Sequence, residues 1–329
     1  MILVTGGAGY IGSHTVKELL RAGHEVVVVD DLTSGHRELV LTEHFAQVDI
    51  RDREGLRAVF RRYPVEAVMH FAALTSVPES VADPGRYYDV NLLGSVNLLE
   101  VMREFGVKTF VFSSSAAVYG DPHVIPIPED HPTQPQSPYG KSKLMVEGVL
   151  ADYARGYGFS YVSLRYFNAA GSDPEQEIGE WHEPERHLIP IVLEAALGKR
   201  PYAEVFGTDY ATPDGTGVRD YLHVVDLAQA HVLALRRLLA GGGSGVFNLG
   251  LGRGYSVREV IEVCRKVTGR EIPVREGPRR PGDPAVLVAD PTRAQRELGW
   301  QPQYNELEPI VETAWRWITR LYGTSRLGS

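Results

Sequence analysis

The sequence predicts an α/β protein: a doubly wound parallel sheet, followed by a second and smaller α/β domain. A glycine-rich turn comes directly after an apolar run at the N-terminus. Short β-forming runs then alternate with helical patterns, which is typical of parallel strands joined through crossover helices. Beyond about residue 168 the elements become shorter and are interrupted by Pro and Gly. We therefore expect one domain at 1–168 and a second, substrate-binding domain at 169–329.

Length and composition favour a cytoplasmic, enzyme-like chain. Of its 329 residues, 43% are hydrophobic and 23% are charged, as in ordinary globular proteins. The single cysteine, Cys264, permits no internal disulfide and fits a reducing compartment. A run of eighteen apolar residues and a secretory signal pattern are both missing from the sequence, so we expect no membrane contact. The net charge of −8 argues against nucleic acid as the main partner.

The first element is a strand at residues 1–5 that runs into the pattern G-x-x-G-x-x-G, formed by Gly6, Gly9 and Gly12. Glycines in such a turn permit the tight bend, the approach of backbone to a pyrophosphate, and the packing of helix on strand. From Ile11 on, apolar residues recur at helical spacing, so the N–H groups at the helix start meet the phosphate charge. The turn, with Tyr10 and Ile11 inside it, predicts a Rossmann domain and a dinucleotide cofactor.

The second strand, at residues 25–29, ends in Asp30, which is followed by Asp31. An acidic residue at this place accepts hydrogen bonds from the adenine ribose and repels a 2′-phosphate. Asp30 lies 18 residues beyond Gly12, close to the expected spacing. NAD is therefore preferred over NADP, although a solvated acid in a turn is the alternative interpretation.

The remaining elements of the first domain follow in alternation. Strands are expected at residues 46–50, 67–71, 109–112 and 160–165, and helices at 53–63, 87–105 and from Pro138 onward. Small residues after the fourth strand, Ala72 and Ala73, leave room for a ligand at the carboxyl edge of the sheet. Asn91 is the polar exception in its helix, and a plain surface position is an equally good interpretation.

Beyond Asn168 the chain is irregular. A helix is expected at 226–239, and it could pack back on the first domain. Residues 323–329 have little to bury and are expected to form a frayed tail.

Tyr139 and Lys143 form the one Y-x-x-x-K of the chain, in the helix that begins at Pro138. Side chains four residues apart share a helix face. A Lys charge about 6 Å away, at an effective dielectric near 20, favours the phenolate by roughly 3 kcal/mol. The pair therefore predicts a tyrosine general base. Ser115, the last of three serines after the fifth strand, is the best placed to bind the oxygen whose proton Tyr139 takes.

The segment His182–His187 contains two histidines and two glutamates, which raises the question of a metal. A zinc-binding helix needs His at i and i+4, whereas these two are five apart with Pro184 between them. We therefore expect no catalytic metal.

Seven segments together resemble the UDP-glucose (UDP-galactose) 4-epimerases of the extended short-chain dehydrogenase/reductase group. They are TGGAGYIG from Thr5, Asp30-Asp31, FSSSAAVYG from Phe112, PYGKSK from Pro138, RYFNAAG from Arg165, DGTGVRDYLHV from Asp214 and RRPGDPA from Arg279. The resemblance runs from Ile2 to about Trp317.

This resemblance implies tightly held NAD, a UDP-sugar substrate, and a homodimer joined through helices matching 87–105 and 139–157. Ser115, Tyr139 and Lys143 would be catalytic. The glycine turn, Asp30 and Asp31 would share the cofactor with Asp49, Ile50, Phe71, Ala72, Ala73, Asn91, Ser113, Tyr139, Lys143 and Tyr166. The substrate would contact Ser115, Tyr139, Asn168, His187, Leu188, Phe206, Arg219, Tyr221, Arg280, Asp283 and Leu287.

Three positions distinguish this chain within the resemblance. Thr75 stands where many members have Lys, and His187 stands where several have Asn. Leu287 occupies the position that faces the 2-substituent of the sugar, where Tyr is typical of members restricted to plain hexoses. Leucine there predicts some activity on UDP-N-acetylhexosamines, although a core residue of a strand at 285–289 is the alternative.

Two other functions compete with epimerisation. A nucleotide-sugar 4,6-dehydratase needs an acid and a base directly after the hydroxyl residue, where this chain has Ala116 and Ala117. A non-catalytic NAD-binding sensor would be expected to have lost Tyr139 or Lys143, and both are present.

Overall fold

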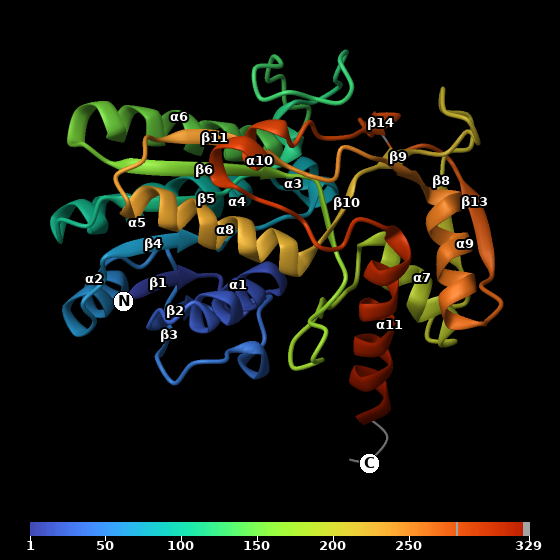
Figure 1. Cartoon of the computed structure of the whole chain (residues 1–329), viewed down its shortest axis with the longest axis horizontal. Helices are drawn as coiled ribbons and strands as arrows, with labels where there is room; N and C mark the ends of the chain where they lie inside the picture. The colour runs from blue at the N-terminus through green and yellow to red at the C-terminus, as the bar shows by residue number, and fades with distance from the viewer. Residues whose placement is uncertain (281, 325–329) are drawn as a thin grey trace.

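The computed structural model describes residues 1–280 and 282–324, and its centre is a parallel seven-stranded sheet (Figure 1). The strand order is β11-β6-β5-β4-β1-β2-β3, and every neighbouring pair is parallel. The strands are β1 (Ile2–Thr5), β2 (Val26–Asp30), β3 (Phe45–Gln47), β4 (Ala67–His70), β5 (Thr109–Ser113), β6 (Ser160–Tyr166) and β11 (Gly245–Leu249). The predicted doubly wound parallel sheet is confirmed.

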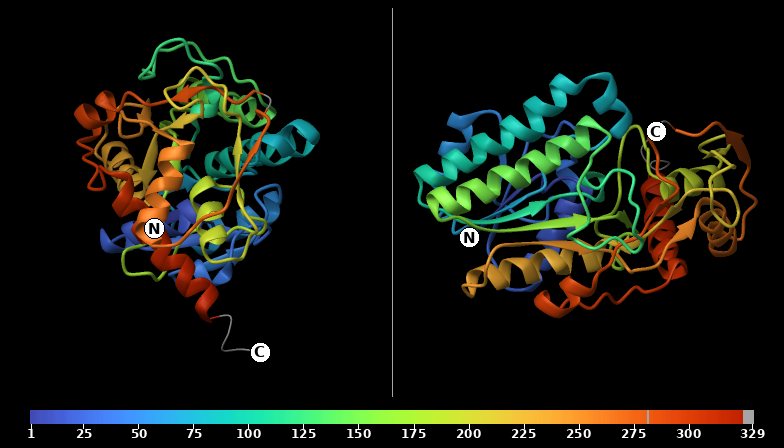
Figure 2. Two further views of the ribbon diagram at one scale, coloured as in Figure 1. Left: turned by 90° about the vertical axis from the view of Figure 1, so that its right-hand side faces the viewer. Right: turned by 90° about the horizontal axis from the view of Figure 1, so that it is seen from above.

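Helices cover both faces of this sheet because alternate strand residues point to opposite sides. In β1, Ile2 and Val4 join one apolar core, and Leu3 joins the other. The first core is closed by α1 (Tyr10–Arg21), α8 (Val224–Leu239) and α10 (Thr292–Leu298). The second is closed by α2 (Arg53–Arg62), α5 (Gly94–Glu104) and α6 (Pro138–Tyr157). Seen from above, α5 and α6 lie on one side of the strands and α8 on the other (Figure 2).

A third apolar core lies beyond the carboxyl edge of the sheet, where α7, α9 and α11 pack together (Figure 1). These helices span Leu188–Ala196, Val257–Thr268 and Leu307–Thr324. Short strands frame them: β7 (Asn168–Ala170) pairs with β10 (Tyr221–His223), β8 (Ala203–Phe206) with β13 (Val274–Gly277), and β9 (Val218–Arg219) with β12 (Tyr255–Ser256) and β14 (Val286–Leu287).

The helix expected at 87–105 consists of three consecutive pieces. After the short α3 (Val77–Ala82) come α4 (Pro84–Tyr87), the π-helical η2 (Tyr88–Leu93) and then α5. Two 3₁₀ turns, η1 (Arg37–Leu39) and η3 (Ala116–Val118), complete the elements. π-helical turns are rare and collect at functional positions. Asn91 lies inside η2 and is buried, so the interpretation as a plain surface position is wrong.

The seventh strand and its covering helix come from beyond the expected domain boundary. Strand β11 belongs to the main sheet and α8 packs on one of its faces, although both follow residue 168. The domain boundary at residue 168 therefore stays a prediction. Part of the chain beyond it returns to pack with the first region. Of the predicted tail, residues 325–329 lie outside the described residues, while Gly323 and Thr324 belong to α11. None of the helices within 1–280 and 282–324 is both long and apolar enough to cross a membrane.

Candidate active site

The start of α6 places Tyr139 and Lys143 against the carboxyl end of β5. The Ser137 side chain accepts a hydrogen bond from the Gly140 N–H at 3.1 Å, and Pro138 occupies the first turn, so the helix begins sharply. Both side chains are buried. The Lys143 Nζ donates to the Ser113 carbonyl at 2.8 Å and lies 5.9 Å from the centre of the Tyr139 ring. The structure thus brings the predicted pair together at the sheet edge.

Ser115 is held at the same edge by the turn that follows β5. Its Oγ accepts a hydrogen bond from the Ala117 N–H at 3.1 Å and caps η3. Burial raises the pKa of Tyr139, and a hydrogen bond from Ser115 opposes this rise. Burial also lowers the pKa of Lys143 to about 7. In the protein alone, burial outweighs the lowering of the Tyr139 pKa that is expected from Lys143, because the same burial disfavours both the phenolate and the ammonium charge.

The glycine turn between β1 and α1 forms a close backbone cradle. Gly6 has a φ of +70°, and a Cβ there would lie 2.5 Å from the Ala72 N. A Cβ on Gly12 would lie 2.1 Å from the Gly6 carbonyl oxygen. No side chain caps the N-terminus of α1, so its first N–H groups are left for an anionic ligand. This donor set suits a dinucleotide pyrophosphate.

Asp30 closes the cradle on the other side. It is buried, and its carboxylate accepts hydrogen bonds from the Ala8 and Leu32 N–H groups at 3.0 and 2.9 Å. Burial raises its pKa, while these two N–H groups oppose the rise. The neighbouring Asp31 is exposed and caps the Thr33 N–H at 2.8 Å. A carboxylate fixed here favours ribose hydroxyls over a 2′-phosphate.

The other predicted cofactor residues border this cradle in different ways. Asp49 forms an ion pair with Arg51 at 2.6 Å, and Ile50 packs under Gly94. Ser113 and Tyr166 share a hydrogen bond of 2.5 Å. Phe71, Ala72 and Ala73 form the turn that follows β4.

The Asn91 side chain forms hydrogen bonds with the segment that follows β4 and does not face an open cavity. Its amide accepts from the Leu74 N–H at 2.8 Å and donates to the Leu74 carbonyl at 3.0 Å and to the Ser142 Oγ at 3.1 Å. Both amide hydrogens are therefore occupied. In this structure Asn91 joins the turn after β4 to α6.

Several predicted substrate residues lie on or near the short strands β8, β9, β13 and β14. The Arg219 guanidinium pairs with Asp283 at 2.6 Å, and Arg280 lies 3.9 Å over the Phe206 ring. Leu287 is paired with Arg219 in the register of β14 and β9. It also packs against the apolar cluster that contains Ala116 and Val118, next to Ser115.

The rest of the predicted substrate set is more scattered. Tyr221 is buried in β10, and the Asn168 N–H donates to the Asp220 carbonyl at 3.0 Å. Leu188 is the first residue of α7. The imidazole of His187 forms a hydrogen bond with Glu180, so in this structure it faces a carboxylate of its own loop.

The comparisons with known proteins agree with this geometry. The profile of the NAD dependent epimerase/dehydratase family matches residues 2–250. The chain belongs to this family. A protein from Halalkalibacterium halodurans named UDP-glucose 4-epimerase is 54% identical over 316 residues, which are 96% of this chain and 95% of its own.

Two solved structures are similar over nearly their whole length. The UDP-glucose 4-epimerase from Brucella ovis, in complex with NAD, has a TM-score of 0.93 and 48% identity, covering 96% of this chain and 97% of its own. The enzyme of that name from Bifidobacterium longum, in complex with NAD+ and UDP, has a TM-score of 0.91 and 41% identity, covering 97% and 98%.

Sequence reasoning missed Asp220, the residue between two predicted substrate contacts. It is fully buried, and its carboxylate accepts hydrogen bonds from the N–H groups of Leu251, Gly252 and Ala289 at 2.8, 3.1 and 3.2 Å. Burial raises its pKa to about 6, against these hydrogen bonds. Asp220 thus fixes Arg219 to the end of β11. The available signal was an acid between Arg219 and the hydrophobic pair Tyr221 and Leu222.

A second missed feature is the buried ion pair between Glu147 and Arg165. The two side chains meet through hydrogen bonds of 3.0 and 2.5 Å, and the Ser114 Oγ donates to Glu147 at 2.6 Å. The pair ties α6 to β6 and to the serine run. Glu147 lies four residues after Lys143 on the same helix face, which was a usable signal.

The expectation about the segment His182–His187 assumed helical spacing. The segment is a loop, so that argument does not apply to it. Glu180, His182, Glu185 and His187 each turn one ligand-type atom toward the others, all within 4.8 Å.

Proposed function

We propose that this chain interconverts UDP-galactose and UDP-glucose through a 4-keto sugar, using tightly bound NAD. The observation that carries the proposal is the meeting of buried Tyr139 and Lys143 with Ser115 at the sheet edge, beside the glycine cradle. The relatives described above, named UDP-glucose 4-epimerase, support the same activity.

The cradle of Gly6, Gly9 and Gly12, with Asp30, would hold the dinucleotide. When bound, NAD supplies the acceptor and later the donor of the hydride at carbon 4 of the sugar. Tyr139 takes the proton of the 4-hydroxyl, Ser115 donates a hydrogen bond to the same oxygen, and the Lys143 charge stabilises the phenolate. The keto sugar turns in the site so that the opposite face of carbon 4 meets the hydride donor, and Tyr139 returns the proton to the 4-oxygen.

The nucleotide part of the substrate would lie on the short strands β8 and β9 and the segment that follows β13. Arg219 and Arg280 offer planar guanidinium groups that match diphosphate oxygens, and Phe206 offers a ring face. In the protein alone, the Arg219 guanidinium pairs with Asp283, and the Arg280 guanidinium stacks on the Phe206 ring. We expect both arginines to turn to the diphosphate on binding. The UDP held there keeps the keto sugar from leaving.

Dehydration and a purely sensory role are less well supported. Ala116 and Ala117 follow Ser115 on η3 and cannot transfer a proton, so the extra acid and base of a 4,6-dehydratase have no place there. A sensor would not require Tyr139 and Lys143 to be buried together.

We further propose a cytoplasmic homodimer that takes part in galactose metabolism. Residues 1–168 would bind the cofactor, completed by β11 and α8, and the rest of 169–329 would bind the UDP-sugar. Large apolar side chains are exposed on η2 and α6, among them Leu93 and Met145, which suits a helical interface. Light scattering coupled to size-exclusion chromatography tests the dimer.

The activity is tested by incubating the purified protein with UDP-galactose and no added cofactor. UDP-glucose should form until the two sugars reach equilibrium. Tyr139→Phe should turn over about 10²–10⁴-fold more slowly with nearly unchanged substrate affinity, because it removes a proton acceptor but little packing. A loss below threefold would exclude Tyr139 as the base.

A further inference from the structure

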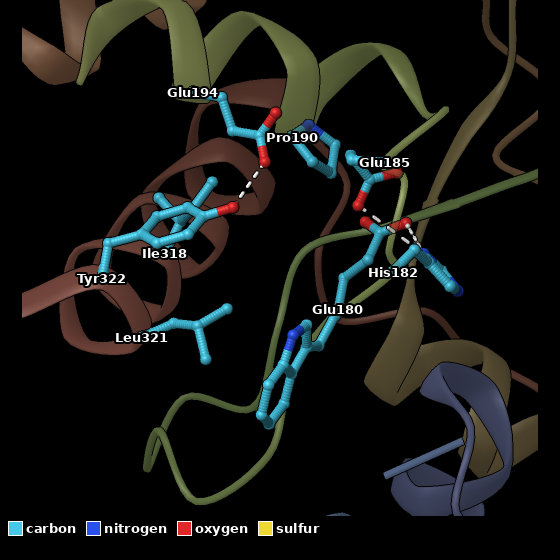
Figure 3. A pocket seen from close by; sticks show the side chains of 9 residues that line it. Glu180, His182, Glu185, Pro190, Glu194, Ile318, Leu321 and Tyr322 are labelled. Carbon is cyan, nitrogen blue, oxygen red and sulfur yellow. Dashed lines mark hydrogen bonds and ion pairs between the residues drawn. The ribbon is translucent and has the colours of Figure 1, made fainter. Parts of the chain in front are cut away.

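Four side chains of metal-ligand type converge in the loop that joins β7 to α7, which contains none of Ser115, Tyr139 and Lys143. One of the four, His187, also belongs to the predicted substrate set. Glu180, His182 and Glu185 line a small pocket against α7 and α11, and both carboxylates face the His182 imidazole (Figure 3). The His182 Nδ1 lies 3.4 Å from the Glu180 Oε1 and 3.6 Å from the Glu185 Oε2. The His187 Nδ1 lies 3.7 Å from the Glu185 Oε1 and forms a hydrogen bond with the Glu180 Oε1.

These separations suit the edges of a tetrahedral metal site. Zinc bonds to imidazole nitrogen and carboxylate oxygen are about 2.0–2.2 Å long, so neighbouring ligand atoms lie about 3.3–3.6 Å apart. The three distances of 3.4, 3.6 and 3.7 Å are near this range, although the last two involve different oxygens of Glu185. One ligand atom from each of the four residues lies within 4.8 Å of the other three, so the set would contract around an ion, and the contact between His187 and Glu180 would widen.

In the protein alone the two carboxylates, acting against burial, raise the pKa of His182 to about 10 and that of His187 as well, so the imidazoles carry the balancing charge. Two features of the cluster nevertheless suit a metal ion. The His182 Nδ1 is buried and has no hydrogen-bond partner, although it points between the two carboxylates. Glu180 and Glu185 are buried, and the ion pairs within residues 1–280 and 282–324 give neither of them a Lys or Arg partner. A divalent cation with two neutral imidazoles would balance both carboxylates.

A neighbouring acidic cluster shows the contrast. Asp173, Glu175 and Glu177 also converge, but the Lys17 ammonium lies among them at 2.6, 2.8 and 2.7 Å. A cation is therefore already in place there, supplied by the chain itself. That cluster serves as the matched control.

We propose that Glu180, His182, Glu185 and His187 bind one divalent metal ion of the zinc class. Four protein ligands leave no open position, so the site is structural. It would lock the loop to three neighbours at once. His182 packs edge-on against the Tyr10 ring with centres 6.2 Å apart, the Glu180 carbonyl accepts from the Trp317 indole at 2.8 Å, and His187 precedes α7.

The test uses the full chain without a histidine tag, loaded with Zn²⁺ and then desalted. Elemental analysis should give one zinc per chain, and competition with a chromophoric chelator should give its affinity. Co²⁺ in place of zinc should produce the strong visible absorption of tetrahedral coordination. His182→Asn and Glu185→Gln should each weaken zinc binding by at least about tenfold. Glu177→Gln, in the control cluster, should leave the stoichiometry and affinity unchanged.

Should His182→Asn or Glu185→Gln fail to fold, His187→Asn replaces it, since that side chain is 51% exposed and easily exchanged. A wild-type chain that retains no zinc at equimolar loading would overturn the proposal. Equal losses in Glu177→Gln and in the ligand variants would overturn it as well. These readouts do not involve turnover, so they are independent of the proposed epimerase activity.

Discussion

At the scale of single residues, the chemistry depends on how Tyr139 and Lys143 share one buried environment. Each group alone is pushed toward its neutral form, with the Tyr139 pKa raised and the Lys143 pKa lowered to about 7. A phenolate and an ammonium formed together stabilise each other, since opposite charges lower the acid's pKa and raise the base's. The working state of this pair is therefore an ion pair, formed when the Tyr139 hydroxyl proton passes to Lys143. The phenolate then accepts the 4-hydroxyl proton of the sugar and becomes neutral again.

We expect Lys143→Met to move the acidic limb of the pH profile of kcat/KM upward by about one unit or more. Without the lysine charge, burial alone acts on Tyr139, and its already raised pKa rises further. The phenolate then forms only at higher pH. The measurement is kcat/KM for UDP-galactose from pH 6 to 10, and an active variant with an unmoved acidic limb would contradict the assigned role.

Leu287 carries the prediction about the sugar. Its register beside Arg219 and its packing near Ser115 place it where it can limit the 2-substituent. Wild-type protein should act on UDP-N-acetylglucosamine more slowly than on UDP-glucose. Leu287→Tyr should lose the former activity selectively, by one to two powers of ten, because overpacking costs about 1–3 kcal/mol. Equal losses on both substrates would instead favour a core role for Leu287.

Single residues were predictable where the chemistry demands a fixed spacing along one element. Tyr139 and Lys143 share one helix face, so the sequence sufficed to pair them. The hydrogen-bond partners of two other residues were not predictable, because only the folded chain brings them together. Asn91 bonds to Leu74 and Ser142. His187 bonds to Glu180. The sequence around a polar residue does not show whether its side chain binds a ligand or a neighbouring loop.

At the scale of elements, the sharp start of α6 aligns the proposed base. Tyr139 is the second residue of the helix, immediately after the cap made by Ser137. Ser137→Ala should cost about 0.5–2 kcal/mol of stability. It should also lower kcat more than it changes KM, since a frayed first turn misplaces Tyr139.

Ser256→Ala is the control at another helix, because Ser256 caps α9 through the Glu259 N–H at 3.1 Å and its Oγ also donates to Asp214. It should cost at least as much stability in a denaturant titration while lowering kcat less than Ser137→Ala does. An equal fall of kcat in both variants would point to general destabilisation rather than to the alignment of Tyr139.

Strands and helices of the main sheet were predictable because each buried strand is a continuous apolar run with turn residues around it. The assignment of β11 to that sheet was not. A strand carries its own pattern but not the identity of its neighbours, and β11 pairs with β6 across an interval of about 80 residues. The conformation of the loop at 171–187 was likewise not predictable from hydrophobic periodicity, because its residues follow no regular pattern.

At the scale of the whole molecule, the cofactor should contribute to global stability. Protein denatured directly after purification should release a dinucleotide without a 2′-phosphate. A ligand present at 100–1,000 times its dissociation constant stabilises the folded state by about 3–4 kcal/mol, so stripped protein should melt several degrees lower. Adding NAD should restore the melting temperature, and NADP should not. Equal rescue by NADP would remove the role given to Asp30.

The path of the chain through its sheet also bears on how such proteins can diversify. Phe247 of β11 and Leu227 of α8 belong to the same core as Ile2. The polypeptide therefore leaves the sheet after β6, builds part of the second region and returns before completing it. A recombination event at residue 168 would cut through one core instead of joining two modules. We therefore expect new sugar preferences in this architecture to arise by substitution on short strands such as β14, and not by exchanging a contiguous half of the gene.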